Sequence, residues 1–515
     1  MIASLSVSPI MDRTTSKQGA ALAFGLLSAL ASLSPSAAWA QAAAPAPDKL
    51  RIADVELSPE IEVRVRGEYR NNPPDLGGAI PQRASAPLAA PPVENAWGIT
   101  ERARVGLGAE RGMMAARLTL QDARIWGAPA EGVTLASPAT FRERQATGFG
   151  AYEAWAELRG SGVRPSFLRL GRQAVSWGEG RLLGTADFSP AGRALDAVRA
   201  RLVVGDLDLE ALAVLLEAPR PVSTAVEGSS SAAGTTSGTE LLGVRAGWAL
   251  SPLLQVELFG FARVADGDAA STAVAGSAFV ASRAKGEKLT GALRLSGQKG
   301  GFQYGLEGAY QVGKLRGGAG PVPTNAPIAA FAISGHLQDT LRGVTWSPTL
   351  RLAGSYASGD PGKGGTYTQF DPLLPDPQRF HGQMDLFGFS NLVDLAGRVE
   401  VVPLTDTTLG FEYRYAHLAE RRGEWIGSYL SSLGRNGLPS SGDPPGDLGH
   451  ELDARFTYRP HSSFHLTAAY SALLLGEGAR AVMASSLRGT PDGQGSVAAP
   501  STAHYTFLQA TVRLP

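Results

Sequence analysis

The sequence predicts an all-β fold, a transmembrane antiparallel β-barrel of the outer-membrane type with about eighteen strands, short periplasmic turns and long extracellular loops. Three observations predict this class. Segments of about ten residues alternate apolar with polar side chains, and the gaps between them alternate short with long. No apolar run after the N-terminal region is long enough for a membrane-spanning helix.

The composition excludes several other classes of protein. The 63 glycines and the modest charge content argue against the soluble domains, about three or four, that a length of 515 residues would otherwise suggest. The formal net charge is zero, so we expect no binding of nucleic acid. Cysteine is absent, which excludes disulfides, thiolate metal ligands and cysteine nucleophiles.

The N-terminal region has the pattern of a signal peptide. Arg13 and Lys17 precede an apolar stretch over 19–33, and Ala38-Trp39-Ala40 forms a cleavage site. The alternative is a membrane anchor, but the apolar stretch is too short for one. We therefore predict a signal peptide over 1–40, a disordered Ala/Pro leader over 41–50 and a barrel domain over 51–515.

The predicted strands follow a period of two residues. In the clearest strand, 62–70, Val63, Val65 and Tyr69 share one face, and the glutamate and arginine residues between them take the other. Similar segments are expected at 98–108, 113–123, 150–160, 166–174, 194–204, 207–217, 239–250, 253–264, 287–297, 301–313, 329–341, 346–358, 391–402, 406–419, 449–459, 463–474 and 503–514.

The gaps between these segments indicate how the strands are connected. The short gaps are 110–112, 161–165, 205–206, 251–252, 298–300, 342–345, 403–405 and 460–462. The long gaps are 71–97, 124–149, 175–193, 218–238, 265–286, 314–328, 359–390, 420–448 and 475–502. An outer-membrane barrel has this alternation, whereas a propeller would show a sequence repeat and a sandwich has no reason to keep long loops at one end.

The two faces of the strands differ in chemistry. The apolar faces expected to contact lipid include Leu254, Val256 and Leu258, then Leu289, Leu293 and Leu295, then Leu452, Phe456 and Tyr458. Aromatic residues expected to form girdles at the membrane interfaces are Tyr69, Tyr152, Trp248, Trp346, Tyr413, Tyr415, Tyr458 and Tyr505. The opposite faces carry charge and are expected to line the lumen, because charges facing lipid are costly.

Arginine dominates this predicted lumen. The same alternation assigns to it Arg64, Arg66, Arg102, Arg104, Arg117, Arg159, Arg169, Arg199, Arg201, Arg294, Arg351, Arg398, Arg414 and Arg455. Unpaired arginines would attract an anion, and a uronate carboxylate fits them well. The alternative is that most of them pair with acidic residues on neighbouring strands, such as Glu62, Glu157 and Glu412, and only brace the wall.

Three groups of residues resemble the alginate-export family of outer-membrane proteins. They are Leu170-Gly171-Arg172-Gln173 with Trp177-Gly178-Glu179-Gly180-Arg181 and Gly192-Arg193-Ala194-Leu195-Asp196-Ala197-Val198-Arg199; Gly354-Ser355-Tyr356-Ala357-Ser358-Gly359-Asp360 with Phe370-Asp371-Pro372-Leu373 and Asn391-Leu392; and Gly449-His450-Glu451-Leu452-Asp453 with Thr457-Tyr458-Arg459-Pro460-His461 and Gly476. Each motif alone is weak, but the set spans most of the chain in the order of the family.

The resemblance implies an eighteen-stranded barrel with an arginine-lined conduit for an anionic polysaccharide. It places Arg172, Arg181, Arg193, Asp196 and Arg199 in the conduit or at its mouth. The alternative is that the glycines of this region shape a tight folded-in loop, with Arg181 and Arg193 tying it to Glu179 or Asp187.

Two features depart from the family pattern. The resemblance implies a long periplasmic turn that plugs the pore, whereas every short gap here is too small to form a plug, which argues against gating from the periplasm. The last strand ends Val512-Arg513-Leu514-Pro515, without the aromatic residue that usually ends such barrels.

Other functions have little support in the sequence. The seven histidines are scattered, no hydrolase or nucleotide-binding motif is present, and we expect no enzyme activity, metal site or cofactor. We expect a monomeric barrel in outer-membrane lipid, with an anionic polysaccharide as substrate and periplasmic export partners. The alternatives are a porin for small organic anions and a non-conducting barrel whose outer loops bind or support other molecules.

Overall fold

The computed structural model describes residues 50–73, 95–126, 148–162, 164–217, 220–222, 234–236, 238–266, 279, 283, 285–316, 325–430, 432–435, 443–487 and 499–515. The predicted signal peptide and nearly all of the predicted leader lie outside these residues, and Leu50 opens the short strand β1 (Leu50–Ile52). Within the described residues, no helix is long and apolar enough to cross a membrane.

Within the residues that the structure describes, 18 strands form a closed antiparallel β-barrel. The strands are β2 (Val55–Asn71), β3 (Asn95–Arg111), β4 (Met114–Ile125), β5 (Gly148–Arg159), β6 (Phe167–Gln173), β7 (Leu195–Val204), β8 (Leu207–Glu217), β11 (Thr239–Ser251), β12 (Leu254–Asp266), β13 (Lys285–Lys299), β14 (Phe302–Leu315), β15 (Pro327–Thr340), β16 (Thr349–Ala357), β17 (Leu392–Leu404), β18 (Thr407–His417), β21 (Asp447–His461), β22 (Phe464–Leu475) and β23 (Thr502–Leu514). The wall closes because β2 pairs with β3 on one side and with β23 on the other.

Each predicted strand overlaps one strand of this wall, and most boundaries agree within a few residues. The largest difference is at β2, which begins at Val55 rather than at residue 62. The part of β2 that the prediction left out contains Pro59. Pro59 is tolerated because it precedes Ile61, the first residue of β2 that pairs with β23, and so lies where β2 extends beyond its neighbour.

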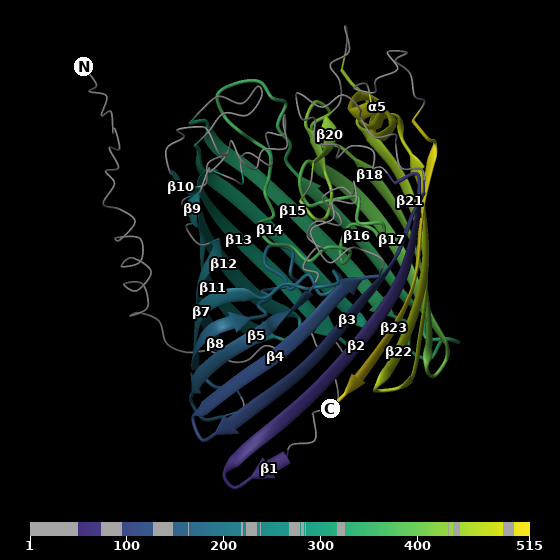
Figure 1. Ribbon diagram of the computed structural model, residues 1–515. Helices are drawn as coiled ribbons and strands as arrows, with labels where there is room; N and C mark the ends of the chain where they lie inside the picture. Colours follow the sequence, from purple (N-terminus) through teal and green to yellow (C-terminus); the bar gives the residue numbers. More distant parts are fainter. Residues whose placement is uncertain are drawn as a thin grey trace, which may run out of the picture.

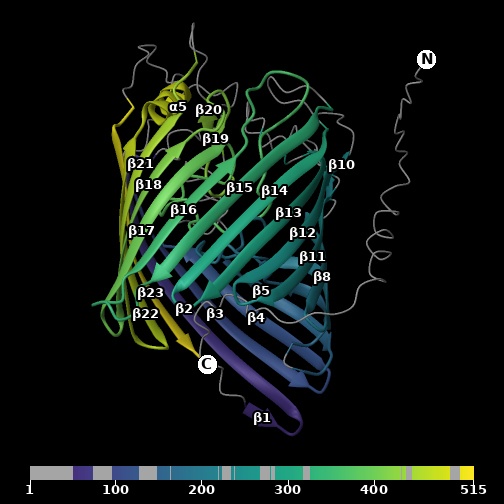
Figure 2. The ribbon, with the colours of Figure 1, turned by 180° about the vertical axis from the view of Figure 1, so that it is seen from behind.

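The short turns and the long connections lie at opposite ends of the barrel. The C-terminus and β1 lie at the end of the short turns, and helix α5 (Glu477–Leu487) lies at the other end (Figures 1 and 2). Two short hairpins belong to the long connections: β9 (Arg220–Val222) with β10 (Gly234–Thr236), and β19 (Glu424–Ile426) with β20 (Ser432–Arg435).

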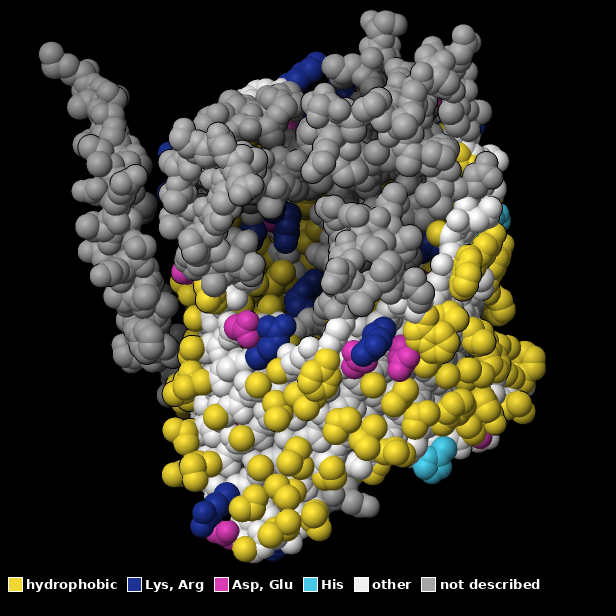
Figure 3. All heavy atoms as spheres, viewed as in Figure 1, with side chains coloured by type: hydrophobic (Ala, Val, Ile, Leu, Met, Phe, Trp, Pro, Cys, Tyr) yellow, Lys and Arg dark blue, Asp and Glu magenta, His cyan; other side chains and the backbone are white. Residues whose placement is uncertain are grey.

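The alternation of faces is confirmed by the burial of the side chains. Leu293 on the outer face of β13 is 43% exposed, whereas the neighbouring Arg294 is 3% exposed. Figure 3 shows hydrophobic side chains spread over the outer wall, and Lys and Arg side chains in a hollow above it. The apolar outer face can therefore contact lipid, and the charged inner face can contact water in the lumen.

The assignment of Tyr152 and Tyr505 to the aromatic girdles is wrong, because both side chains are buried inside the barrel. At Tyr152 the register between β4 and β5 shifts, since Thr119 pairs with Glu153 but Leu120 pairs with Ala151. This bulge turns Tyr152 inward. Tyr505 simply follows the inward parity of Phe507 on β23.

Two of the long connections fold into the barrel instead of extending outward. They cover 174–194, between β6 and β7, and 358–391, between β16 and β17, and most of their residues are buried. Their apolar side chains, including Leu183 and Phe370, belong to one buried cluster with β12, in which Trp177 packs against Phe259 and Phe261. The expectation that 175–193 and 359–390 are outer loops is therefore corrected: these segments narrow the lumen.

Candidate functional site

The arginines of β2 and β3 hold the folded-in segment 174–194. Arg64 donates hydrogen bonds to the carbonyl oxygens of Asp187 (2.6 Å) and Ser189 (2.7 Å). Arg102 lies 2.9 Å from the Asp187 carboxylate, and Arg104 lies 3.3 Å from it. These predicted conduit residues are therefore in the lumen, but in this structure they contact the protein itself.

Most of the other predicted lumen arginines pair with carboxylates on the wall. Arg66 pairs with Glu68 of the same strand at 2.7 Å. Further pairs join Arg169 to Glu157, Arg199 to Glu210, Arg398 to Glu412 and Arg414 to Asp394 and Glu412. The alternative reading of the sequence, in which most arginines brace the wall, thus describes most of these residues.

Arg351 and Arg455 differ from this majority. Arg351 donates a long hydrogen bond of 3.4 Å to Gln338, and Arg455 donates one of 2.9 Å to Gln383. Among the described residues, no carboxylate lies within ion-pair distance of either guanidinium. The charge of these two lumen arginines is therefore not neutralised by a described carboxylate within ion-pair distance.

The two folded-in segments are joined to each other. Arg193 donates hydrogen bonds to the carbonyl oxygens of Gly184, Leu374 and Pro375, at 2.8 to 3.0 Å. The carboxylate of Asp376 accepts a hydrogen bond from the backbone N–H of Ala186. Arg193, which was expected in the conduit or as a tie to Glu179 or Asp187, instead ties segment 174–194 to segment 358–391.

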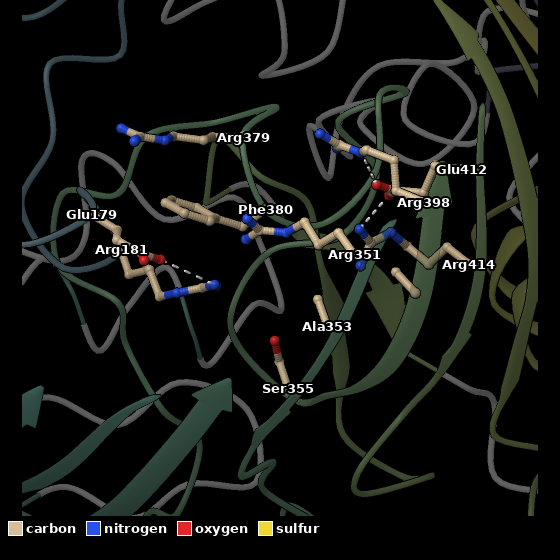
Figure 4. A pocket seen from close by; sticks show the side chains of 11 residues that line it. Glu179, Arg181, Arg351, Ala353, Ser355, Arg379, Phe380, Arg398, Glu412 and Arg414 are labelled. Atoms are coloured by element: carbon tan, nitrogen blue, oxygen red, sulfur yellow. Dashed lines mark hydrogen bonds and ion pairs between the residues drawn. The ribbon is translucent and has the colours of Figure 1, made fainter. Parts of the chain in front are cut away.

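A cavity of about 150 Å³ lies between these segments and the wall. Its lining consists of Glu179, Arg181, Arg351, Ala353, Ser355, Arg379, Phe380, Ala396, Arg398, Glu412 and Arg414. Figure 4 shows Arg181 and Glu179 on one side and Arg398, Glu412 and Arg414 on the other, with Arg351 and Phe380 between them. Segment 174–194, segment 358–391 and the strands β16, β17 and β18 each contribute residues, so the cavity exists only in the folded barrel.

The lining of this cavity is strongly cationic. It has five arginines and two glutamates, which leaves a formal charge of +3. Arg181 lies over the Phe380 ring, with 4.0 Å between its guanidinium carbon and the ring centre. The side chain of Arg181 is 4% exposed, and its Nη1 has no hydrogen-bond partner in the protein. A buried cationic donor of this kind requires an acceptor from water or from an anion in the cavity.

The two glutamates are themselves paired with cations. Glu412 accepts hydrogen bonds from Arg398 (2.7 Å) and Arg414 (2.6 Å). Burial opposes the ionisation of Glu179, but Arg181 and its cationic neighbours outweigh burial and lower the pKa of Glu179 to about 2. Glu179 therefore stays ionised and holds Arg181 at 3.6 Å without neutralising the cavity.

A second cavity of about 200 Å³ adjoins the first, because both are lined by Arg379, Arg398 and Glu412. The second cavity also receives Arg455 and Asp453 from β21. Arginines line both cavities, from Arg181 to Arg455, but the second cavity also carries Glu400, so its three arginines face three carboxylates and its formal charge is zero.

Arg172 and Asp196 do not belong to this lumen. They form an ion pair of 3.0 Å on the outer face of β6 and β7, with side chains 40% and 60% exposed. Asp196 shares this face with the exposed Val198. Their assignment to the conduit is corrected, because the period of two places them on the face opposite to Arg169 and Arg199.

Sequence reasoning missed Arg379 and Phe380 of the cavity. Both lie in segment 358–391, which has no strand periodicity from which the direction of a side chain could be read. No signal in the sequence distinguishes them from residues of an exposed loop.

The described part of the chain contains no group of three His, Asp or Glu side chains arranged to hold a metal ion. Asp371, for example, contacts Lys288 and Arg283. The described acidic residues of the lumen are thus engaged mainly with cationic side chains.

Comparison with solved structures gives similarity to Pseudomonas aeruginosa OccK11 (OpdR), with 13% identity, a TM-score of 0.47, and coverage of 89% of this chain and 96% of that chain. Acinetobacter baumannii OccAB2 is similar with 12% identity, a TM-score of 0.49, and coverage of 88% and 97%. P. aeruginosa OccK2 (OpdF), solved in complex with glucuronate, has 10% identity, a TM-score of 0.48, and coverage of 89% and 98%. The chain has no match among curated proteins.

A family model described as alginate export matches residues 56–488, which include nearly the whole barrel wall and both folded-in segments. The match covers well over half of the chain and includes the segments around Arg181, Asp360 and Asp453. The chain is an outer-membrane channel protein, and it belongs to the alginate export family.

Proposed function

We propose that this channel passes an anionic polysaccharide or oligosaccharide, such as alginate, passively along an arginine-lined lumen. The observation that carries the proposal is the cavity around Arg351, where five arginines meet two glutamates. A guanidinium stays charged at physiological pH and binds a carboxylate through two parallel hydrogen bonds. A polymer with a carboxylate on each sugar is suited to this lining.

Release of the polymer is as necessary as its binding. Conduction requires several sites of moderate strength, so that an anion can leave one for the next. Arg379 and Arg398 line both cavities, which supports a stepwise transfer between them. The pairing of Arg398 with Glu412 at 2.7 Å moderates the attraction at the shared boundary.

The test is single-channel conductance of the refolded mature chain in a planar bilayer. Oligo-alginate is titrated against neutral dextran of equal size. We expect anion-selective conductance that the oligo-alginate blocks at low concentration and the dextran does not. Equal effects of the two polymers would reject the proposed substrate class.

A second candidate is a porin for small organic anions. The cavities of about 150 and 200 Å³ favour it, since the folded-in segments leave little room in the lumen. The length of the blocking solute separates the two candidates. A glucuronate monomer that competes as well as a long oligomer at equal carboxylate concentration would favour the porin. A chain without any conductance would instead favour a surface binding or structural barrel.

The maturation and partners of the chain are also proposals. We propose that residues 1–40 are removed on export and that the mature chain is a monomer that works with periplasmic export partners. The motivating observation is the Ala38-Trp39-Ala40 site. Mass spectrometry of the chain from purified outer membranes should give an N-terminus at Gln41, and an uncleaved chain would contradict this.

A further inference from the structure

Four arginines of β2 and β3 form a concave surface on the lumen wall, here called the arginine cradle: Arg64, Arg66, Arg102 and Arg104. Residues 187–191 of the folded-in segment lie in it. Arg66 donates a hydrogen bond of 2.9 Å to the carbonyl oxygen of Phe188, and its guanidinium carbon lies 3.8 Å from the centre of that ring. Arg104 donates one of 3.1 Å to the carbonyl oxygen of Ala191.

The segment offers the cradle a row of oxygen atoms. The Asp187 carboxylate lies 2.9 Å from Arg102 and 3.3 Å from Arg104, and carbonyl oxygens from Asp187 to Ala191 accept further hydrogen bonds from the cradle. An anionic oligosaccharide presents the same chemistry, a carboxylate followed by neutral oxygens. The cradle is therefore occupied by a peptide that resembles an anionic sugar chain in its acceptors.

Two of the four cradle arginines depend on this segment for neutralisation, whereas Arg66 pairs with Glu68 and Arg102 also pairs with Glu62 on the wall. Among the described residues, the only carboxylate within ion-pair distance of Arg64 or Arg104 is that of Asp187. The side chains of Arg64 and Arg104 are 6% and 12% exposed. Buried cations that lose their anion are strongly destabilised, so another anion would be taken up in its place.

Asp187 is accessible to competition. Its side chain is 38% exposed to the lumen although its three arginine neighbours are nearly buried. Burial raises the pKa of Asp187, but Arg102, followed by the other cradle arginines, outweighs burial and holds that pKa well below its usual range. The Asp187 carboxylate is thus ionised and partly exposed to solvent, and an anion that binds the cradle more strongly can replace it.

We infer that the arginine cradle is a second anion-binding site of the lumen, which takes polymers of carboxylated sugars and which residues 187–191 occupy as an internal competitor. This inference rests on the proposed function for the identity of the polymer. Binding of the polymer in the cradle displaces residues 187–191 from the wall. The lumen then widens on the β2–β3 side, and the cradle faces the solute with Arg64 and Arg104 freed of Asp187, while Arg66 and Arg102 keep their wall partners Glu68 and Glu62.

The absence of cysteine allows a direct test, because an introduced thiol is the only one in the chain. Ser189 is 3% exposed, and Ser189→Cys places a thiol in the segment that occupies the cradle, where it is shielded from solvent. We would measure the rate of its reaction with a membrane-impermeant maleimide in detergent-solubilised full-length barrel. Ala191→Cys, at a position 5% exposed, is a second reporter in case the first variant does not fold.

The inference predicts faster labelling in two arms. Oligo-alginate should accelerate labelling of Ser189→Cys, whereas neutral dextran should not. Adding Asp187→Asn should accelerate it about tenfold without any polymer, because a charge-assisted contact is lost. Glu157→Gln is the matched control, since it removes the same charge from a wall residue that pairs with Arg159 and Arg169, and it should leave labelling unchanged.

The results separate this inference from the proposed function. Oligo-alginate that blocks conductance while labelling stays slow in both arms would overturn the inference and leave the function intact. Oligo-alginate that fails to block would overturn the proposed function, and the Asp187→Asn arm would still decide whether that carboxylate holds the segment. Acceleration by Glu157→Gln equal to that by Asp187→Asn would also overturn the inference, because charge alone would then explain it.

Discussion

Replacing Arg351 by glutamine is expected to weaken block by oligo-alginate roughly 10- to 100-fold while the barrel still folds. Arg351 lines the cavity and has only a 3.4 Å hydrogen bond to Gln338, so its charge is available to the solute. A hydrogen bond to a charged group contributes about 1.5–3 kcal/mol, and each 1.4 kcal/mol changes affinity about tenfold. Glutamine keeps a donor for Gln338, and no wall carboxylate loses a partner.

The assay is the concentration of oligo-alginate that halves single-channel conductance, measured for wild type and variant in the same bilayer. Arg172→Gln is the matched control, because it removes the same chemical group from the outer face, 3.0 Å from Asp196. The half-blocking concentration should rise for Arg351→Gln and stay constant for Arg172→Gln. Circular dichroism of both variants should give the spectrum of the wild-type barrel.

Two results would refute this reasoning. If oligo-alginate blocks the Arg351→Gln channel at the same concentration as the wild-type channel, the cavity does not bind the solute. If Arg172→Gln loses as much affinity as Arg351→Gln, the effect comes from the overall charge of the barrel and not from the lumen.

Three further predictions concern stability. Asp371→Asn should lower the free energy of unfolding by about 3–5 kcal/mol, because it breaks the buried ion pair of 2.8 Å between Asp371 and Lys288. Guanidinium unfolding in detergent measures this free energy, and a decrease of less than about 1 kcal/mol would contradict the prediction. Leu293→Arg should cost about 2–4 kcal/mol in folding into vesicles, since it puts a charge on the lipid face, and an unchanged folding yield would count against that orientation. The pKa of Glu179 is about 2 in the folded chain, below its ordinary value of 4.5. The ionised Glu179 therefore stabilises the fold fully above pH 4.5, and this stabilisation is lost as the pH falls toward 2. Glu179→Gln should remove this part of the pH dependence of thermal unfolding, and identical pH profiles for variant and wild type would disprove the prediction.

The strand pattern was predictable because it is local. A period of two residues identifies each strand and both of its faces from its own side chains, as for Leu293 outside and Arg294 inside. The even alternation of short and long gaps then required an antiparallel barrel. The rule failed where the backbone departs from it, at the bulge that turns Tyr152 inward, because one extra residue in a strand leaves no mark in the sequence.

The candidate site was predictable only in its residue type. The sequence determined the barrel, its strands and an interior rich in arginine. The tertiary structure decided which arginines are paired, because their partners are distant in the chain: Arg64 contacts Asp187, 123 residues away, and Arg193 contacts Leu374, 181 residues away. The path of segments 174–194 and 358–391 depends on such contacts and not on periodicity. The sequence therefore determined that the lumen is rich in arginine, and only the fold decided that Arg351 and Arg455 contact glutamines and not carboxylates.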